Sequence, residues 1–178
     1  PFDTALTDYS APSWLPGGHL QTIWPALWSR RFESTAPNWR RERWDTPDGD
    51  FVDVDFCEAH AFVASGIHHR QRPLLVLFHG LEGSSSSHYS QAFADWGLKN
   101  GCDIAVPHFR GCSGTLNLMP RAYHSGDHEE VHHLLSRFKQ SADAQSRPGL
   151  IVAGVSLGGN ALMRWAGEHG QSAQQVVN

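Results

Sequence analysis

Apolar residues gather in three short runs in the middle and second half of the chain. Each run is bounded by proline, glycine or a polar residue and is short enough for a single strand. Continuous apolar runs of this kind are typical of strands that are buried on both faces of a parallel sheet. We therefore predict three such strands, at 73–80 (PLLVLFHG), 102–109 (CDIAVPHF) and 149–156 (GLIVAGVS).

Between and after these runs the pattern changes to that of amphipathic helices. Four apolar residues follow one another at i, i+3, i+4 and i+7, which predicts a helix over about 127–140. Serines 84–87 are suitable N-cap residues for another helix over about 89–99. A third helix is expected to begin at 157, directly after the last apolar run. The residues with the i, i+3, i+4, i+7 spacing are Val131, Leu134, Leu135 and Phe138.

Upstream of the first run, the pattern predicts an antiparallel hairpin. An Asp-Gly pair at 48–49, a strong turn signal, separates the segments 40–46 (RRERWDT) and 50–58 (DFVDVDFCE). In the second segment, apolar residues alternate with Asp53 and Asp55, roughly the period of a half-buried strand. A hairpin followed by alternating strands and helices indicates an α/β fold with a largely parallel sheet, in one domain over residues 1–178.

Residues 1–38 form an aromatic-rich N-terminal arm. Several of its apolar residues follow helical spacing, although Pro25 would interrupt a long helix. We expect the tryptophans Trp14, Trp24 and Trp28 to pack onto the domain. The alternative is that they form a wall of an acyl pocket or a membrane-facing patch, since such rings suit interfaces.

Composition narrows the class of partner. The 178 residues carry 14 Lys and Arg against 18 Asp and Glu, a formal net charge of −4, which gives no basic surface for nucleic acid. No apolar run approaches the roughly 20 residues of a membrane helix. The chain begins at Pro1, so an upstream membrane anchor stays compatible with the sequence.

The three cysteines of the chain are Cys57, Cys102 and Cys112. An odd number of cysteines without C-x-x-C spacing indicates reduced thiols and a cytoplasmic protein.

The strongest chemical signal is AGVSLGGN at 153–160, in which Gly154, Ser156 and Gly158 have the G-x-S-x-G spacing. This spacing is typical of a serine nucleophile on a sharp turn between a strand and a helix. Its backbone is strained, so the residues two positions away must be small. The motif follows a predicted buried strand and opens a predicted helix, which is the expected context. The N–H of Leu157, at the start of that helix, is then a candidate oxyanion donor.

A second turn supports the same chemistry. The segment 79–89 (HGLEGSSSSHY) follows an earlier predicted strand, and the backbone N–H of Leu81 is the candidate for the second oxyanion donor. The competing interpretation is that both segments are turns of a dinucleotide-binding fold. It is disfavoured because no G-x-G-x-x-G follows the first parallel strand.

With both motifs in place, the chain resembles the YheT-like branch of the α/β hydrolases (the AB-hydrolase-4 type). The resemblance implies an α/β-hydrolase fold of which this chain is the N-terminal part, and a serine carboxylic-ester hydrolase with Ser156 as nucleophile. Some relatives of this kind transfer the acyl group to alcohols instead. The segments that carry the resemblance, in the family's order, are PGGHLQTIWP (16–25), DGDFVDVDF (48–56), LFHGLEGSSSSHY (77–89), HFRGCSG (108–114), RAYHSGD (121–127) and GVSLGGNAL (154–162).

The chain departs from the family because it ends before the triad acid and histidine, which follow the serine in hydrolases. After Ser156 only Glu168 and His169 remain, and they lie roughly 18 Å along the next helix. We therefore expect the triad Asp and His outside this chain, and expect the chain alone to be inactive. Structural roles are expected for the upstream histidines His79, His108 and His124.

The missing strands have a physical consequence as well. The usual hydrolase sheet places further strands beside 150–155 (LIVAGV), which would otherwise be a bare apolar edge. The isolated chain is then expected to be poorly soluble, to self-associate through this edge, or to be a fragment of a longer protein.

A different class of enzyme is suggested by HEEVH at 128–132, which matches the H-E-x-x-H pattern of zinc proteases. No third ligand at a suitable spacing is evident, and both histidines fall on the flank of the predicted helix. We therefore expect no metal and no cofactor. The preferred function is hydrolysis of short- to medium-chain acyl esters through an acyl-serine intermediate. An acyltransferase or a non-catalytic binding module of the same fold is the alternative.

Overall fold

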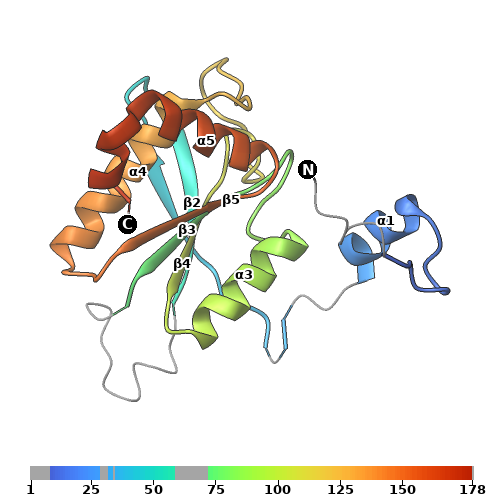
Figure 1. Ribbon diagram of the computed structural model, residues 1–178. Coiled ribbons are helices and arrows are strands. Elements are labelled where there is room, and N and C mark those ends of the chain that lie inside the picture. Colours follow the sequence, from blue (N-terminus) through green and yellow to red (C-terminus); the bar gives the residue numbers. More distant parts are fainter. Residues whose placement is uncertain (1–8, 29–31, 34, 59–71, 178) are drawn as a thin grey trace.

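A computed structural model describes residues 9–28, 32–33, 35–58 and 72–177. Its centre is a five-stranded sheet in the order β1-β2-β4-β3-β5 (Figure 1). The strands β3, β4 and β5 are mutually parallel, whereas β2 runs antiparallel to both β1 and β4. The predicted α/β class and hairpin-led parallel sheet are therefore confirmed. The strands are β1 (Arg40–Asp45), β2 (Phe51–Cys57), β3 (Leu74–Phe78), β4 (Asp103–Pro107) and β5 (Leu150–Gly154).

Helices cover both faces of the sheet. One face carries α3 (His88–Lys99), and the other carries α4 (His128–Ala144) and α5 (Leu157–His169), which pack on each other (Figure 1). Strand β3 supplies both cores, because successive side chains of a strand point to opposite faces. Its alternate residues join the cluster under α4 and α5 or the cluster under α3, and all five are buried.

The predicted helices are present within a few residues of their expected bounds. Ser87 holds the N-cap position of α3, but its side chain makes no capping hydrogen bond there. Its hydroxyl instead accepts a hydrogen bond from the Ser84 N–H at 3.0 Å. The N-cap of α4 is Asp127, whose carboxylate accepts from the Glu130 N–H. After α5 the chain continues in a short 3-10 helix, η3 (Gly170–Gln175).

Strand β5 lies at the edge of the sheet, as the sequence predicted for this segment. Among the described strands it pairs only with β3. Within β5, Ile151 is exposed, with 39% of its surface accessible to solvent, and the next three residues are half-buried. One row of backbone groups of this apolar strand therefore has no neighbouring strand among the described residues.

Strand β2 differs from the prediction. It is not half-buried: Asp53 and Asp55 are 2% and 3% exposed, although they point away from the main core. Arginines of β1 cover them, with Arg43 bound to Asp53 at 2.8 and 2.9 Å and Arg41 bound to Asp55 at 2.7 and 2.8 Å. Burial raises the pKa of both carboxyls, but the arginine hydrogen bonds, a serine hydrogen bond to each carboxyl and the nearby positive charges together outweigh it and leave each pKa below its ordinary value.

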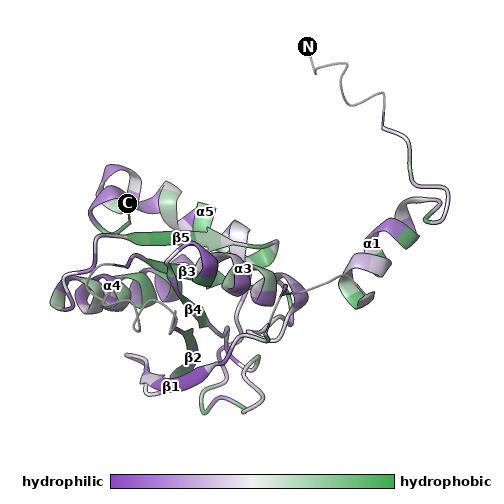
Figure 2. Cartoon of the chain, turned by 90° about the horizontal axis from the view of Figure 1, so that it is seen from below, coloured by the Kyte–Doolittle hydropathy of each residue, from purple (hydrophilic) through white to green (hydrophobic). Residues whose placement is uncertain are grey.

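The N-terminal arm also differs from the prediction. Helix α1 (Gly18–Trp28) stands away from the sheet and has no buried residue (Figures 1 and 2). Trp14 and Trp28 are 62% and 65% exposed, so the expected packing of these tryptophans onto the domain is wrong. Trp14 instead meets Trp24 edge to face, with ring centroids 5.1 Å apart. Pro25 lies inside the helix, which ends three residues later.

Two further properties bear on the sequence predictions. Each of the three cysteines is free, two of them buried. No helix within the described ranges has both the length and the apolar character needed to span a membrane.

Candidate active site

Ser156 occupies a sharp turn between β5 and α5, as the motif predicts. Its backbone has φ 52° and ψ −115°, a left-handed conformation that is rare for a residue with a side chain. The ladder continues past β5, because the Val155 N–H donates to the Phe78 carbonyl at 3.0 Å. The turn therefore begins on a strand that is fixed to β3 up to the residue before Ser156.

The glycines around Ser156 are required by close backbone approaches. A β-carbon on Gly158 would lie 2.4 Å from the carbonyl oxygens of both Phe78 and His79. One on Gly154 would lie 2.7 Å from the backbone of Gly159. Real β-carbons essentially never come within 3.0 Å of such atoms. The first turn of α5 thus sits directly on the end of β3, which is the physical reason for the G-x-S-x-G spacing.

The turn after β3 lies beside Ser156. A β-carbon on Gly80 would be 3.4 Å from the β-carbon of Ser156 and 3.4 Å from the Val155 carbonyl. The Gly83 N–H closes this turn on the Gly80 carbonyl at 3.0 Å. The segment that holds Leu81 is therefore next to the strained serine, although 75 residues separate Leu81 from Ser156 in the sequence.

The two backbone N–H groups singled out from the sequence have no acceptor within the part of the chain that the structure describes. Those of Leu81 and Leu157 make none of the hydrogen bonds found there, whereas their neighbours Glu82 and Gly158 both donate. The Leu157 N–H lies at the N-terminus of α5, where the helix dipole favours negative charge. The arrangement suits an oxygen that becomes negatively charged next to Ser156.

Two tyrosines that sequence reasoning missed bind this turn. The Gly80 N–H donates to the Tyr89 hydroxyl at 2.9 Å. The Glu82 N–H donates to the Tyr123 hydroxyl at 3.1 Å, and that hydroxyl donates to the Glu82 carboxylate at 2.7 Å. Tyr89 and Tyr123 both lie within segments that carried the family resemblance, but nothing in their spacing indicated these contacts.

His79 and His108 are buried and fully engaged in hydrogen bonds. Nε2 of His79 accepts from the Phe109 N–H at 2.9 Å, so its Nδ1 carries the proton and donates to the Gly80 carbonyl at 2.7 Å. Nε2 of His108 accepts from the Ser85 N–H at 3.2 Å, and its Nδ1 donates to the Asp53 carbonyl at 3.1 Å. Burial lowers the pKa of both, that of His79 to about 4. These contacts agree with the structural roles expected for the two histidines, and neither ring has a free nitrogen for Ser156.

The remaining histidines of interest are also engaged elsewhere. Nδ1 of His124 accepts from the Gly126 N–H at 3.1 Å. His169, at the far end of α5, stacks on His132 with centroids 4.1 Å apart. Its neighbour Glu168 pairs with Arg164. No described histidine or carboxylate makes a hydrogen bond to the Ser156 hydroxyl.

The zinc alternative finds no support in the HEEVH segment. Nδ1 of His132 accepts from the Trp165 indole N–H at 3.2 Å, and Glu130 binds Arg110 at 2.5 Å. The side chain of Glu129, the general base of the pattern, is exposed. Within the described residues, no group of three or more His, Cys, Asp or Glu side chains is arranged to hold a metal ion.

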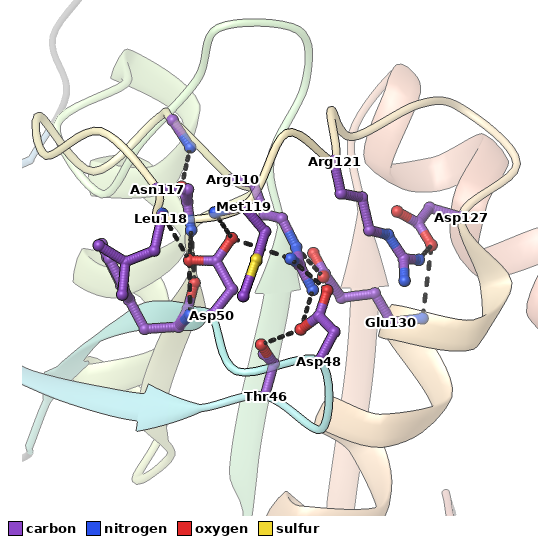
Figure 3. Close-up of polar contacts among 12 residues, drawn as sticks. Thr46, Asp48, Asp50, Arg110, Asn117, Leu118, Met119, Arg121, Asp127 and Glu130 are labelled. Carbon is purple, nitrogen blue, oxygen red and sulfur yellow. Dashed lines mark hydrogen bonds and ion pairs between the residues drawn. The ribbon is translucent and has the colours of Figure 1, made fainter.

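A largely buried network around Arg110 connects the hairpin turn, the loop after β4 and the start of α4 (Figure 3). The Arg110 guanidinium contacts Asp48 at 2.8 Å and Asp50 at 3.0 Å in the hairpin turn, and Glu130 at the start of α4. Asp50 also accepts hydrogen bonds from Asn117, Leu118 and Met119 in the loop after β4 and from the Phe51 N–H. Burial raises the pKa of Asp50, but these hydrogen bonds together outweigh it and lower that pKa to about 2. Burial raises the pKa of Glu130 despite Arg110. The network ties the hairpin, this loop and α4 together. Arg110 follows β4 and Ser156 follows β5, so both lie at the carboxyl end of the parallel strands.

Comparisons with known proteins agree with this geometry. A family model described as alpha/beta hydrolase fold matches residues 73–178. YheT of Escherichia coli (strain K12), provisionally named an esterase, is 42% identical over 144 residues, which cover 81% of this chain and 39% of that protein. The monoacylglycerol lipase ABHD2 of Danio rerio is 30% identical over 92% of this chain and 36% of its own length. The chain thus spans less than two fifths of these curated relatives.

Solved structures show the same fold at low sequence identity. The esterase Est22 superposes with a TM-score of 0.58 at 18% identity, over 83% of this chain and 43% of that chain. The thermophilic carboxylesterase EstE1 gives a TM-score of 0.59 at 15% identity, over 83% and 46%. At these identities the likeness is one of fold.

Proposed function

The chain belongs to the α/β hydrolase fold family, and we propose that the protein is a serine carboxylic-ester hydrolase acting on short- to medium-chain acyl esters. The observation that carries the proposal is the approach of the Gly80 turn to Ser156. It brings a strained serine beside the unpaired N–H groups of Leu81 and Leu157. A nucleophile flanked by two such donors is the arrangement that acyl transfer requires.

The proposed reaction has two halves. The Ser156 hydroxyl oxygen attacks the ester carbonyl carbon, and its proton passes to a histidine base. The carbonyl electron pair moves to the oxygen, which the N–H groups of Leu81 and Leu157 stabilise. When the intermediate collapses, the C–O bond to the alcohol breaks and the alcohol leaves with the proton. Water then attacks the acyl-serine in the same way and releases the acid and free Ser156.

We propose that the histidine and the carboxylate that orients it come from the part of the protein that these residues do not include. His79 and His108 use both ring nitrogens in buried hydrogen bonds. The relatives are more than twice as long as the matched segment, which leaves room for both groups. On this basis residues 1–178 alone have no esterase activity.

The test compares residues 1–178 with the full-length protein, and makes Ser156→Ala in both, where this substitution should leave neither activity nor labelling. We expect p-nitrophenyl acetate and butyrate hydrolysis, together with fluorophosphonate labelling, in the full-length protein only. Ser172→Ala, an exposed serine of η3, is the matched control and should retain both signals. Turnover by residues 1–178 that Ser156→Ala abolishes would refute the need for outside groups. Labelling unaffected by Ser156→Ala would refute the proposed nucleophile.

A further inference from the structure

Three successive backbone N–H groups, those of Gly80, Leu81 and Glu82, lie in the turn after β3 and differ in their hydrogen bonding. Gly80 donates to the Tyr89 hydroxyl and Glu82 donates to the Tyr123 hydroxyl. The N–H between them, that of Leu81, has no acceptor among the residues with a described structure. Of these three donors, the two outer ones are therefore occupied by phenol oxygens, and the middle one is left for another acceptor.

The turn is strained at Glu82. Leu81 and Glu82 are the central residues of the turn closed by the Gly83 N–H and the Gly80 carbonyl. Glu82 has φ +52°, at a position of such turns that usually takes Gly or Asn. A left-handed conformation costs a residue with a side chain roughly 1–2 kcal/mol, so the surroundings must hold it. Tyr123 does so at two points, since its hydroxyl both accepts from the Glu82 N–H and donates to the Glu82 carboxylate.

The two tyrosines are themselves fixed. The Tyr123 ring stacks on Phe109 with centroids 5.3 Å apart and an interplanar angle of 11°, and the Phe109 N–H is bound to His79. Tyr89 lies in the first turn of α3, and its hydroxyl fills the inside of the turn: a β-carbon on Gly83 would lie 2.3 Å from it. Tyr89 is therefore fixed by its helix and Tyr123 by its stack on Phe109, and their hydroxyls accept from the N–H groups before and after that of Leu81.

We infer that Tyr89 and Tyr123 are positioning residues that take up the N–H groups on either side of Leu81, hold the strained turn, and so leave the Leu81 N–H as the donor to the oxyanion. The inference rests on the proposed function, because it concerns the same acyl-transfer site. Neither hydroxyl is assigned contact with substrate. Each acts through the orientation of the Leu81 peptide relative to Ser156.

The chain supplies matched variants for a test in the full-length protein. Tyr89→Phe and Tyr123→Phe remove one hydroxyl each and keep the ring, including the stack on Phe109. Tyr9→Phe is the control, because it removes the only other tyrosine hydroxyl of the chain, which is exposed and bound to Gln21 in the arm. Glu82→Gln is the conservative variant, since its amide oxygen can still accept from Tyr123.

The measurements are KM for p-nitrophenyl butyrate and kcat, with kcat calculated per active site titrated with a fluorophosphonate. Loss of one whole oxyanion donor typically lowers kcat by 10²–10³-fold. Misalignment of a donor that is still present should lower kcat by roughly ten- to a hundredfold in Tyr89→Phe and Tyr123→Phe. We expect KM to stay within about twofold, because an oxyanion donor acts on the transition state more than on bound substrate. Tyr9→Phe and Glu82→Gln should keep most of the wild-type kcat.

The outcomes separate this inference from the proposed function. If wild-type activity survives Ser156→Ala, the proposed function fails and the inference fails with it. If activity depends on Ser156 but kcat per active site stays within twofold in both tyrosine variants, only the inference is overturned. A fall in the number of titrated sites, with unchanged kcat per site, would also overturn it, because the tyrosines would then serve folding alone.

Discussion

The tight packing of the first turn of α5 on the end of β3 can be tested with two glycines of one helix. Gly158 lies in that first turn, and Gly167 lies two to three turns later. A β-carbon on Gly158 would fall 2.4 Å from two backbone carbonyl oxygens of Phe78 and His79, whereas one on Gly167 meets nothing within 4 Å. Gly158→Ala and Gly167→Ala therefore add the same methyl group to the same helix in opposite surroundings.

The expected magnitudes follow from these contacts. In Gly158→Ala the β-carbon must gain at least 0.6 Å to reach the 3.0 Å limit of real contacts, and the atoms that oppose it are backbone. Overpacking against atoms that cannot rotate away costs about 3 kcal/mol, while the higher helix propensity of alanine returns about 1 kcal/mol. We expect a net loss of about 2 kcal/mol in the free energy of unfolding. Gly167→Ala should gain about 0.5–1 kcal/mol, because only the propensity changes.

Urea denaturation of the full-length protein, followed by circular dichroism and tryptophan fluorescence, measures both changes. Fluorophosphonate labelling reports on the turn itself, and we expect it to slow in Gly158→Ala but not in Gly167→Ala, since only Gly158 is next to Ser156. Equal stability of the two variants would refute the argument that backbone contact, and not conformational freedom, requires glycine at 158. A destabilised Gly158→Ala with wild-type labelling would show that the helix moves without moving the serine.

Three further outcomes are expected. Burial lowers the pKa of His79 from 6.5 to about 4, so between pH 4 and 6.5 the unfolded chain binds more protons than the folded protein. The free energy of unfolding should therefore rise from pH 4 to 6.5, and the contribution of His79 should be complete above pH 6.5. In His79→Gln this rise with pH should be shallower. Arg110→Met removes the positive charge that pairs with the buried carboxylates of Asp50 and Glu130, and should lower the free energy of unfolding, measured by urea denaturation at pH 7, by about 3 kcal/mol or more. The control Lys139→Met loses only an exposed pair with Asp143 and should lower it by under about 1 kcal/mol. Ile151→Lys on the β5 edge should reduce self-association of residues 1–178 in sedimentation velocity; unchanged association would place the contact elsewhere.

The elements of the fold were predictable where local pattern and burial coincide. The apolar runs at 73–80 and 102–109 became the fully buried strands β3 and β4, whereas the run at 149–156 became β5, which is partly exposed because it lies at the edge of the sheet. The glycines around Ser156 were predictable for the same reason, since their spacing reflects contacts within one turn and the strand beside it. In each case the deciding interactions lie close in sequence or follow from the type of sheet.

Other features depend on partners that the local pattern does not identify. The alternation in β2 suggested a solvated face for Asp53 and Asp55, but arginines of β1 and Ser85, 30 residues beyond Asp55, bury it. The Tyr123 hydroxyl reaches Glu82 across 41 residues, a pairing that only the tertiary fold creates. The tryptophans of the arm were expected to pack because large apolar rings are usually covered, yet α1 has no partner among the described elements that buries it.

Backbone strain gives an argument for the site that does not depend on motif recognition. Within the described residues, three positions other than glycine have positive φ: Glu82, Ser146 and Ser156. Ser146 lies just beyond the C-terminus of α4, where a left-handed residue commonly ends a helix. The other two lie on the turns that meet at Gly80. Strained residues persist only where their surroundings hold them, and they concentrate at functional sites. Tyr123 holds Glu82 through hydrogen bonds, whereas the close packing of Gly154 and Gly158 holds the turn at Ser156, so removing either support should disturb the same small region.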